Sequence, residues 1–490
     1  MIYPNNFEQK IGFDEIRALL KKQCLSTLGK EMVDEISFSD NAETVNEWLL
    51  QVKEFRRMQE DTDSFPMQYF FDVRESVTRL RLEGTHMEES ELFDLRRSME
   101  TICSIVRILS ESEDSAFKYP ALNRLTENVV TFPELIRHID RILDRFGHMR
   151  DDASPALAET RRELSRTEGS ISRTLYSILR SAQSEGLVEK DVTPAFRDGR
   201  LVIPVAPALK RKIRGIVHDE SATGKTIFIE PAEVVEANNR IRELEAEERR
   251  EVIRILKEFA KQVRPHVHDI LNSYHFLAQI DLIHAKAELA DRTKAVEPHV
   301  ETFPHIDWIH AIHPLLRLSL DKQGKQVVPL DIMLTRERFI LIISGPNAGG
   351  KSVCLKTVGL LQYMIQCGLP VPLGDRSRVG IFESIMIDIG DEQSIENDLS
   401  TYSSHLTNMK QMMRNSNERT LLLIDEFGGG TEPQIGGAIA EAVLKQFCQR
   451  KVFGVITTHY QNLKHFADSH DNVVNGAMLY DRHNMQALFQ

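Results

Sequence analysis

The stretch Gly345-Pro-Asn-Ala-Gly-Gly-Lys-Ser352 carries the residue types that hold a nucleoside triphosphate. It follows an apolar run at Arg338–Ile343 and opens a stretch of helical spacing, which is the setting of a phosphate-binding loop. The glycines let successive backbone N–H groups turn toward phosphate oxygens at the start of a helix. We expect Lys351 to reach the β- and γ-phosphates and the Ser352 hydroxyl to bind Mg²⁺. The predicted nucleotide-binding residues here are Gly345, Pro346, Asn347, Ala348, Gly349, Gly350, Lys351 and Ser352.

A second apolar run, Leu421–Ile424, ends in two carboxylates. We expect Asp425 to support Mg²⁺, and Glu426 to polarise the water that attacks the γ-phosphate. Thr457-Thr-His459 follows a further apolar run, so His459 is expected at the same edge of the sheet, as a sensor of the γ-phosphate. The residues predicted to be catalytic are therefore Glu426, His459 and Lys351.

The tripeptide Gly224-Lys225-Thr226 resembles the end of such a loop, but its context differs. Position 219 is Asp where the first Gly is required, and no apolar strand leads into it. We interpret this segment as a turn.

The elements that position the motifs alternate between strand and helix from about residue 300. Strands are predicted at 338–343, 384–389, 420–424 and 451–456, and helices at 352–367 and 435–447. This alternation predicts a mainly parallel α/β sheet at 299–490.

The N-terminal part of the chain is rich in helical spacing. We expect a helical core at 1–155, a long outgoing helix at 156–189, and a returning helix with more of the core at 233–298. Pro265 should kink the returning helix or mark a joint in it. Short β-prone runs at Leu201–Val205 and Thr226–Ile229 predict a small β-rich module at 190–232, carried on the two long helices.

That β-rich module is basic within an acidic chain. The 490 residues have a net charge of −12, yet seven basic and three acidic residues lie between Arg197 and Lys225. A solvated surface and a phosphate-contacting surface both fit this pattern. The residues predicted to contact nucleic acid are Lys210, Arg211, Lys212 and Arg214.

Composition narrows the class of protein. Five scattered cysteines without a C-x-x-C pair favour neither a disulfide framework nor a zinc site. The first ten residues do not form a signal peptide, and no apolar run is long enough to span a bilayer. We therefore expect a cytoplasmic protein without membrane contact.

Taken together, the motifs resemble the MutS family, and the whole chain resembles its second bacterial subfamily, which lacks the mismatch-reading N-terminal domain. The resemblance rests on the phosphate-binding loop and on segments after it: Ile389-Gly-Asp-Glu-Gln-Ser-Ile395, Leu399-Ser-Thr-Tyr-Ser-Ser-His405, Asp425-Glu-Phe-Gly-Gly-Gly-Thr-Glu-Pro433 and Thr457-Thr-His459. Outside that region it rests on Val202-Ile-Pro-Val205, Gly215-Ile-Val-His-Asp219 and Phe228-Ile-Glu-Pro231.

The resemblance implies two long lever helices carrying a clamp, followed by an ABC-type ATPase that uses ATP and Mg²⁺. It also implies a homodimer joined through the ATPase domains, with each active site shared between two chains. Ser400, Thr401 and Ser403 would then act in trans, and His313 would lie on the adenine side. The family often has Phe where Tyr402 stands, and a residue other than glycine where Gly429 stands.

The C-terminal residues Met485–Gln490 resemble a hairpin strand from which the relatives continue into dimerising helices and a small nuclease-type domain. We therefore expect a C-terminally truncated chain without a nuclease domain. Mismatch reading is not expected, because Phe13-Asp-Glu15 and Phe132-Pro-Glu134 fall in predicted helical scaffold.

Three functions stay open at this point. The first is an ATP-gated clamp on branched or otherwise structured DNA that controls recombination. The second is an ATPase that recognises stalled or collided ribosomes, through ribosomal RNA, and separates their subunits. The third is a fragment that binds ATP without turning it over.

Overall fold

The computed structural model describes residues 1–61, 65–113, 116–186, 188–197, 199–345, 350–390, 398–429, 432–477, 480–481 and 486–487. The chain divides into two compact units. Unit 1 comprises Met1–Phe70, Ser104–Val129 and Tyr274–Gln490, and unit 2 comprises Phe71–Cys103 and Val130–Ser273. Helices α6 (Glu89–Leu109) and α11 (Val267–Thr293) each run from one unit into the other.

A six-stranded sheet forms the centre of unit 1, in the order β1-β13-β14-β15-β11-β16. All of its neighbouring strands are parallel. The strands are β1 (Ile2–Tyr3), β11 (Ile340–Ser344), β13 (Ser384–Asp388), β14 (Thr420–Ile424), β15 (Phe453–Thr457) and β16 (Val473–Ala477). The four strands predicted from apolar runs are thereby confirmed. Every residue of β13, β14 and β15 is buried, as expected for a sheet covered on both faces.

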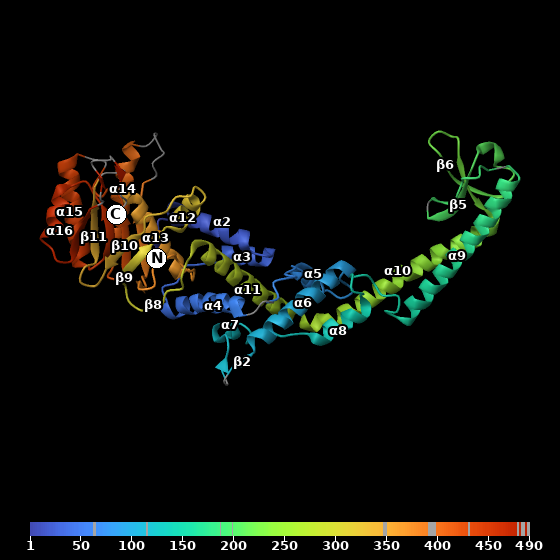
Figure 1. Ribbon diagram of the computed structural model, residues 1–490, viewed down its shortest axis with the longest axis horizontal. Helices are drawn as coiled ribbons and strands as arrows, with labels where there is room; N and C mark the ends of the chain where they lie inside the picture. The colour runs from blue at the N-terminus through green and yellow to red at the C-terminus, as the bar shows by residue number, and fades with distance from the viewer. Residues whose placement is uncertain are drawn as a thin grey trace. The chain divides into compact units, whose positions relative to one another are not determined.

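Helices cover both faces of this sheet, as the orange and red part of Figure 1 shows. They are α13 (Lys351–Gln366), α14 (Asp398–Asn415), α15 (Pro433–Gln449) and α16 (Gln461–Asp468). The chain crosses from β11 to β13 in one direction along the sheet and returns through β14 and β15 to β16. Because parallel crossovers are right-handed, α13 lies on one face and the other three helices lie on the opposite face.

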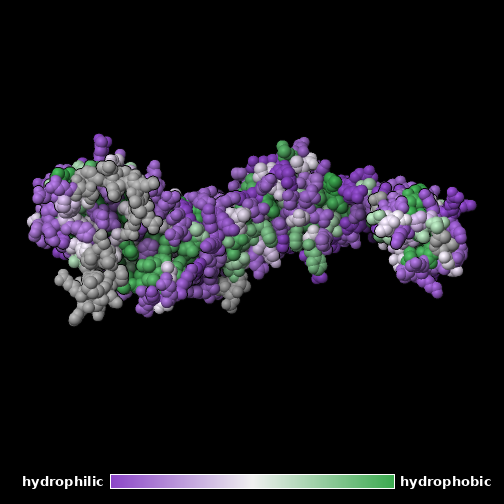
Figure 2. All heavy atoms as spheres, turned by 90° about the horizontal axis from the view of Figure 1, so that it is seen from above, coloured by the Kyte–Doolittle hydropathy of each residue, from purple (hydrophilic) through white to green (hydrophobic). Residues whose placement is uncertain are grey.

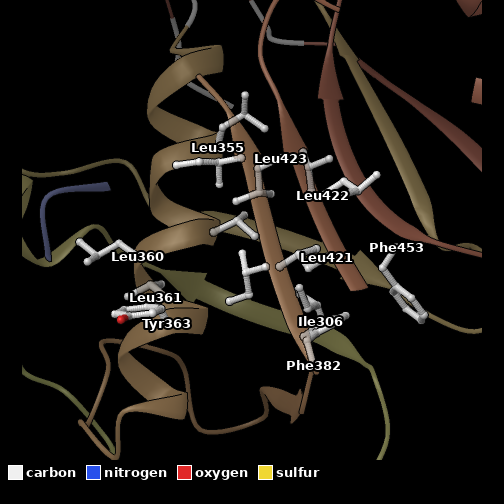
Figure 3. Close-up of a cluster of buried hydrophobic side chains, with 14 of the residues drawn as sticks. Ile306, Leu355, Leu360, Leu361, Tyr363, Phe382, Leu421, Leu422, Leu423 and Phe453 are labelled. Carbon is white, nitrogen blue, oxygen red and sulfur yellow. The ribbon is translucent and has the colours of Figure 1, made fainter. Parts of the chain in front are cut away.

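The apolar contact between α13 and the sheet holds the start of that helix in place. Leu355 of α13 lies beside Leu423 of β14 in Figure 3, and Leu361 of α13 and Leu421 of β14 belong to the same buried cluster. All four side chains are fully buried. Burial of this kind stabilises by roughly 1.5–3 kcal/mol per large apolar side chain. The N-terminal end of α13, where the phosphate-binding loop stands, is therefore anchored by the core.

The N-terminus contributes to unit 1 in a way that its helical pattern did not predict. Strand β1 pairs with β13 at the edge of the sheet, with Ile2 opposite Ile385 and Tyr3 opposite Met386. The helices that follow bury Phe7 and Phe13 against Tyr363 of α13, with ring centroids 5.1 and 4.8 Å apart. The first residues are therefore part of the same core as the sheet.

The remaining elements of unit 1 are further helices and small sheets. The helices are α1 (Phe7–Ile11), α2 (Phe13–Gln23), α3 (Thr27–Asp34), α4 (Ala42–Asp61), α7 (Pro120–Arg124) and α12 (Pro314–Asp321). A four-stranded sheet has the order β10-β9-β12-β8, from β8 (Val300–Glu301), β9 (Ile306–Ala311), β10 (Leu330–Leu334) and β12 (Arg378–Gly380). Two-stranded sheets pair β2 (Ser112–Glu113) with β3 (Ala116–Phe117), and β17 (Tyr480–Asp481) with β18 (Gln486–Ala487).

Unit 2 contains α5 (Arg74–Arg79), α8 (Pro133–Ile142) and two long helices, α9 (Pro155–Ser184) and α10 (Val235–Val263). The long helices run side by side in Figure 1. They are antiparallel, because Arg161 pairs with Glu248 at 2.8 Å while Glu163 pairs with Arg240 at 2.9 Å. Helix α10 ends at Val263 and a 3₁₀ turn, η3 (Arg264–His266), separates it from α11. The joint predicted at Pro265 is confirmed.

A four-stranded antiparallel sheet lies at one end of α9 and α10, in the order β4-β5-β7-β6. Its strands are β4 (Ala195–Arg197), β5 (Arg200–Val205), β6 (Gly215–Glu220) and β7 (Ile227–Pro231), with 3₁₀ turns η1 (Pro207–Leu209) and η2 (Ala232–Val234). The β5 and β7 runs were predicted, and the sequence 221–225 forms a turn, closed by a bond from Gly224 N to Ser221 O of 2.7 Å. Apolar side chains of β5 and β7 share one buried cluster with α9 and α10.

The face seen in Figure 2 is mainly hydrophilic, with scattered apolar patches. Within the residues that the structure describes, no helix combines the length and apolar character needed to cross a membrane.

Candidate functional site: the carboxyl edge of the parallel sheet

The two described ends of the predicted phosphate-binding loop have the backbone shape that such a loop needs. Gly345 follows β11 with a φ of 132°, and Gly350 precedes α13 with a φ of 87°. A side chain at either position would be strained, which explains why the motif has glycine there. Pro346, Asn347, Ala348 and Gly349 lie outside the described residues.

Lys351 is the first residue of α13 and is only 2% exposed. Its Nζ donates to the Gly345 carbonyl at 2.8 Å and lies 3.2 Å from Nε2 of His459. Burial lowers the pKa of Lys351, and the carboxylates of Asp425 and Glu426 oppose that shift. The predicted phosphate-binding lysine and the predicted sensor histidine therefore meet at the edge where β11 and β15 end.

Ser352 and Asp425, the two predicted Mg²⁺ ligands, are in direct contact. The Ser352 hydroxyl donates to Asp425 Oδ2 at 2.6 Å. Thr457, at the end of β15, donates from its hydroxyl to Asp425 Oδ1. Because both carboxylate oxygens are occupied by hydroxyl donors, the Asp425 side chain is held in one orientation.

Glu426 has the left-handed backbone conformation, with a φ of 50°. Few residues other than glycine adopt this conformation, and such strain is often found at functional sites. Two bonds hold the turn: Glu426 N donates to Thr457 Oγ1 at 2.8 Å, and Gly429 N donates to Glu426 O at 2.8 Å. Thr457 thus holds the carboxylate of Asp425 and the backbone N–H of Glu426. Thr457 belongs to the motif Thr457-Thr-His459, but the motif by itself predicted no role for it.

The loop after Glu426 is packed closely against its neighbours. A Cβ on Gly428, whose φ is 85°, would lie 2.9 Å from the Ala440 Cβ and 2.9 Å from the ring of Tyr460. The Tyr460 hydroxyl donates to the Gly428 carbonyl at 2.9 Å. Tyr460, the residue directly after His459, therefore holds the loop that follows Glu426 in place.

Asp388, at the end of β13, forms a second polar cluster beside the first. Its carboxylate is 4% exposed; Oδ2 lies 2.7 Å from Nδ1 of His405, and Oδ1 accepts from Nδ2 of Asn408 at 2.8 Å. Tyr3 of β1 donates to Asn408 Oδ1 at 2.6 Å. The Asp388 backbone carbonyl accepts from Asp425 N at 2.8 Å. Sequence reasoning missed this cluster, although His405 ends one of the quoted motifs.

The trans residues predicted from the family resemblance lie at the start of α14. Ser400, Thr401 and Ser403 are helical residues there, and Ser403 is exposed. The side chains of Ser400 and Thr401 lie outside what the structure describes.

His313 stands at the N-terminus of α12, where its Nδ1 accepts from Leu316 N at 3.4 Å. Burial, with a smaller effect of the Lys356 charge, lowers its pKa to about 4. The imidazole is therefore neutral near pH 7.

The basic residues predicted to contact nucleic acid lie in unit 2, on the segment between β5 and β6. Lys210, Arg211, Lys212 and Arg214 are all exposed. Ile213 between them is buried in the apolar cluster of the sheet, so it anchors the segment. The four cations consequently face solvent from a fixed backbone.

The donor set at the sheet edge fits Mg²⁺ and a triphosphate. Mg²⁺ is usually bound by one or two protein oxygen ligands together with phosphate oxygens and waters. Ser352 and Asp425 supply such a hard oxygen pair beside Lys351. Among the described residues, no group of three or more His, Cys, Asp or Glu side chains forms a metal cage, and this type of site does not need one.

Residues 341–490 match the family model of MutS domain V. The chain is 36% identical over 480 residues to "Endonuclease MutS2" of Geobacillus sp. (strain WCH70), covering 98% of this chain and 60% of that protein. The chain belongs to the MutS family.

Further relatives place it near one branch of the MutS family. It is 34% identical over 471 residues to "Endonuclease MutS2" of Enterococcus faecalis, covering 96% of this chain and 59% of the relative. It is 36% identical over 480 residues to the protein of the same name from Finegoldia magna, covering 98% and 60%. The chain is therefore MutS2-like, and it spans about 60% of the length of these curated relatives. The resemblance expected from the motifs is confirmed.

Proposed function

We propose that this MutS-family chain hydrolyses ATP at the carboxyl edge of its parallel sheet and uses that cycle to close on structured DNA. The observation that carries the proposal is the meeting of Lys351, Ser352, Asp425, Glu426 and His459 at the ends of three neighbouring strands. These side chains come from segments far apart in the sequence. Their types match the parts of a phosphoryl-transfer site.

In this proposal the chain's own residues position the reactants. The loop from Gly345 to Gly350 holds the phosphates with backbone N–H groups, and Lys351 exchanges its bond with the Gly345 carbonyl for a phosphate oxygen. Ser352 and Asp425 hold Mg²⁺, which when bound neutralises charge that develops on the phosphates. Neutral His313 packs on the adenine side.

Glu426 orients the attacking water in this scheme. Its carboxylate projects from a backbone turn that Thr457 and Gly429 hold in place. Pre-positioning lowers the entropic cost of aligning the water with the γ-phosphate. His459, 3.2 Å from the Lys351 ammonium, contacts the γ-phosphate and reports its presence.

Two chains complete the site. Ser400, Thr401 and Ser403 at the start of α14 contact the γ-phosphate bound by the partner in a homodimer, so hydrolysis depends on chain concentration. The helices α9 and α10 act as lever helices, and the sheet β4-β5-β7-β6 acts as a clamp. Lys210, Arg211, Lys212 and Arg214 then contact phosphates of the nucleic acid backbone.

Structured DNA is the preferred partner because the relatives from Geobacillus, Enterococcus faecalis and Finegoldia magna carry the name "Endonuclease MutS2". A ribosome-directed ATPase is the second candidate, since exposed cations on a clamp suit ribosomal RNA phosphates as well. Binding measurements with each partner separate the two.

The test of ATP turnover uses Glu426→Gln with Glu432→Gln as its matched control. Glu432 lies at the start of α15, is exposed, and makes no side-chain capping bond there. We expect Glu426→Gln to bind ATP with unchanged affinity and to hydrolyse it about 100-fold more slowly, within the range of general-base effects. Glu432→Gln should behave as wild type. Wild-type turnover in Glu426→Gln would mean that another group orients the water.

The test of the nucleic acid partner uses the double variant Lys210→Ala/Arg211→Ala. The exposed pair Arg249 and Arg250 on α10 of the same unit provides a control with equal loss of charge. We expect the first variant to weaken binding to four-way DNA junctions and to lower its salt dependence, with little effect of the control. Co-sedimentation with ribosomes, without junction binding, would instead favour the second candidate.

A further inference from the structure

We propose that Asp388 is a positioning residue that links the nucleotide-binding edge of one chain to the part of α14 that completes the partner's site. The inference rests on the proposed function, because it concerns the shared ATP site. It assigns roles to Asp388, His405, Asn408 and Tyr3, which the motifs alone did not.

The first observation is that Asp388 joins three elements of unit 1. It ends β13, its carboxylate accepts from two side chains of α14, and the next contact of Asn408 is with Tyr3 of β1. His405 and Asn408 are three residues apart, so they lie on one face of the helix. A helix held at two neighbouring points by one buried carboxylate can neither rotate about its axis nor slide along it without breaking a bond.

The second observation is that the same residue touches the nucleotide edge through its backbone. The Asp388 carbonyl accepts from Asp425 N at 2.8 Å, and Asp425 in turn accepts from Ser352. A displacement of the Asp425 strand end on nucleotide binding is therefore passed to Asp388 through one hydrogen bond. It reaches α14 through the two bonds to the carboxylate.

The third observation is that hydrogen bonds from the N-terminal segment hold the groups around Asp388 in fixed orientations. The Tyr3 hydroxyl donates to Asn408 Oδ1, which turns the amide so that its Nδ2 faces Asp388. Lys10 donates from Nζ to the carbonyl of Ile389, the residue after Asp388, at 2.7 Å. The N-terminal segment thus holds the end of β13 and the face of α14 together.

The consequence concerns the N-terminal end of α14. Ser403 lies two residues before His405, within one helical turn of the bond between His405 and Asp388. A shift of the helix at His405 therefore displaces Ser400, Thr401 and Ser403, which in the proposed dimer contact the partner's ATP. Asp388 would act on the partner's site, while Lys351 and Glu426 act on the site of their own chain.

This difference is tested by mixing variants. Asp388→Asn replaces one acceptor oxygen by an amide group that donates, so a donor faces the donor of His405 or Asn408. We expect turnover to fall about tenfold with the KM for ATP changed less than about twofold, because loss of one positioning bond affects the step after binding. Glu426→Gln alone retains only about a hundredth of the turnover in its own site but presents an intact α14.

When Asp388→Asn and Glu426→Gln chains are mixed in equal amounts, a mixed dimer contains one site with an intact loop, an intact Glu426 and an intact partner helix. Random pairing places about a quarter of all sites in this state, so turnover should rise to about a quarter of wild type. Mixing Lys351→Ala with Glu426→Gln should restore nothing, since both changes act on the site of their own chain.

Ser400→Ala mixed with Glu426→Gln is the positive control, because Ser400 is proposed to act in trans. If this control restores turnover and Asp388→Asn does not, Asp388 acts within its own site and the inference is overturned alone. If the control also fails, the shared site itself is refuted, and this inference falls with it. The two failures are therefore distinguishable.

A second pair of variants guards against a folding defect in Asp388→Asn. His405→Ala removes one bond to Asp388, whereas His405→Asn retains a donor near the place of Nδ1. We expect His405→Ala to lower turnover and to be rescued by mixing with Glu426→Gln, and His405→Asn to retain most activity. Equal loss in both variants at unchanged thermal unfolding midpoint would contradict a positioning role.

Discussion

Two buried carboxylates, one in each compact unit, are held by similar partners but neutralised differently. In unit 2, Glu230 of β7 is fully buried and accepts from His218, Asn238 and Arg200. In unit 1, Asp388 of β13 is 4% exposed and is bound by the side chains of His405 and Asn408. Both carboxylates join a sheet to a helix, α10 in one case and α14 in the other.

The two carboxylates differ in the cation that is bound to them. Arg200 donates to both oxygens of Glu230 and also to Asn239 of α10, and arginine stays charged at any ordinary pH. Burial would raise the pKa of Glu230, but the bonds from His218, Asn238 and Arg200 outweigh it and lower that pKa. At Asp388 the bonded cation is a histidine, whose charge depends on pH. A permanent ion pair suits a fixed attachment of the β4-β5-β7-β6 sheet to α10, and a pair with histidine suits the shift of α14 that we propose above.

The largest effect is expected where the permanent pair is broken. Glu230→Ala leaves the guanidinium of Arg200, whose side chain is 14% exposed, without its counter-charge, and should destabilise the β4–β7 sheet by about 3–5 kcal/mol. Hydrogen exchange at the β5 and β7 amides of the full chain measures this loss. The control is Glu220→Ala, an exposed residue on β6. If both variants exchange alike, the Glu230 cluster has no special role in the sheet.

A smaller effect is expected when the charge is kept and the geometry lost. Arg200→Lys retains a cation but cannot donate to Glu230 and to Asn239 with a planar fork, so we expect a loss of about 1–2 kcal/mol. The same hydrogen exchange measurement applies. A loss as large as that of Glu230→Ala would indicate that fork geometry, rather than charge, holds the sheet on α10.

The contact between Asp388 and α14 in unit 1 should tolerate the loss of its carboxylate charge better than the Glu230 cluster does. Asp388→Asn removes one hydrogen bond and a charge whose bonded cation is a histidine, so we expect about 1 kcal/mol of destabilisation in urea unfolding. Destabilisation equal to that of Glu230→Ala would remove the distinction between the two carboxylates.

The smallest expected effect is a change with pH in the contribution of His405 to the free energy of unfolding. The bond to Asp388 raises the pKa of His405, burial opposes this, and Glu426 adds to the rise while Lys10 reduces it. Since the folded pKa lies above the unfolded value of 6.5, the contribution of His405 to stability is fully present below pH 6.5 and is lost as pH rises through the folded pKa. The stability difference between wild type and His405→Asn should therefore shrink in that direction. A difference that grows with pH would mean that the pair is not an ion pair.

Much of the fold could be predicted because the signals are local. Apolar runs of four to six residues marked β11, β13, β14 and β15, and a proline marked the joint between α10 and α11. By contrast, β1 has two residues, and β6 begins at Gly215 and has no buried side chain. A strand so short, or so exposed, has no alternation of apolar and polar residues that could predict it. It is recognised only by its hydrogen bonds to the neighbouring strand.

The candidate site divides in the same way. Spacing within single segments was enough to propose Lys351, Ser352, Asp425 and Glu426 as site residues, because a phosphate-binding loop and the carboxylates after an apolar strand are properties of contiguous residues. Thr457 and Asp388 act through bonds to residues 32 and 17 to 20 positions away, and Asn408 bonds to Tyr3 across 405 positions. Such bonds exist only once parallel strands have brought their carboxyl ends together, so the tertiary structure alone decided them.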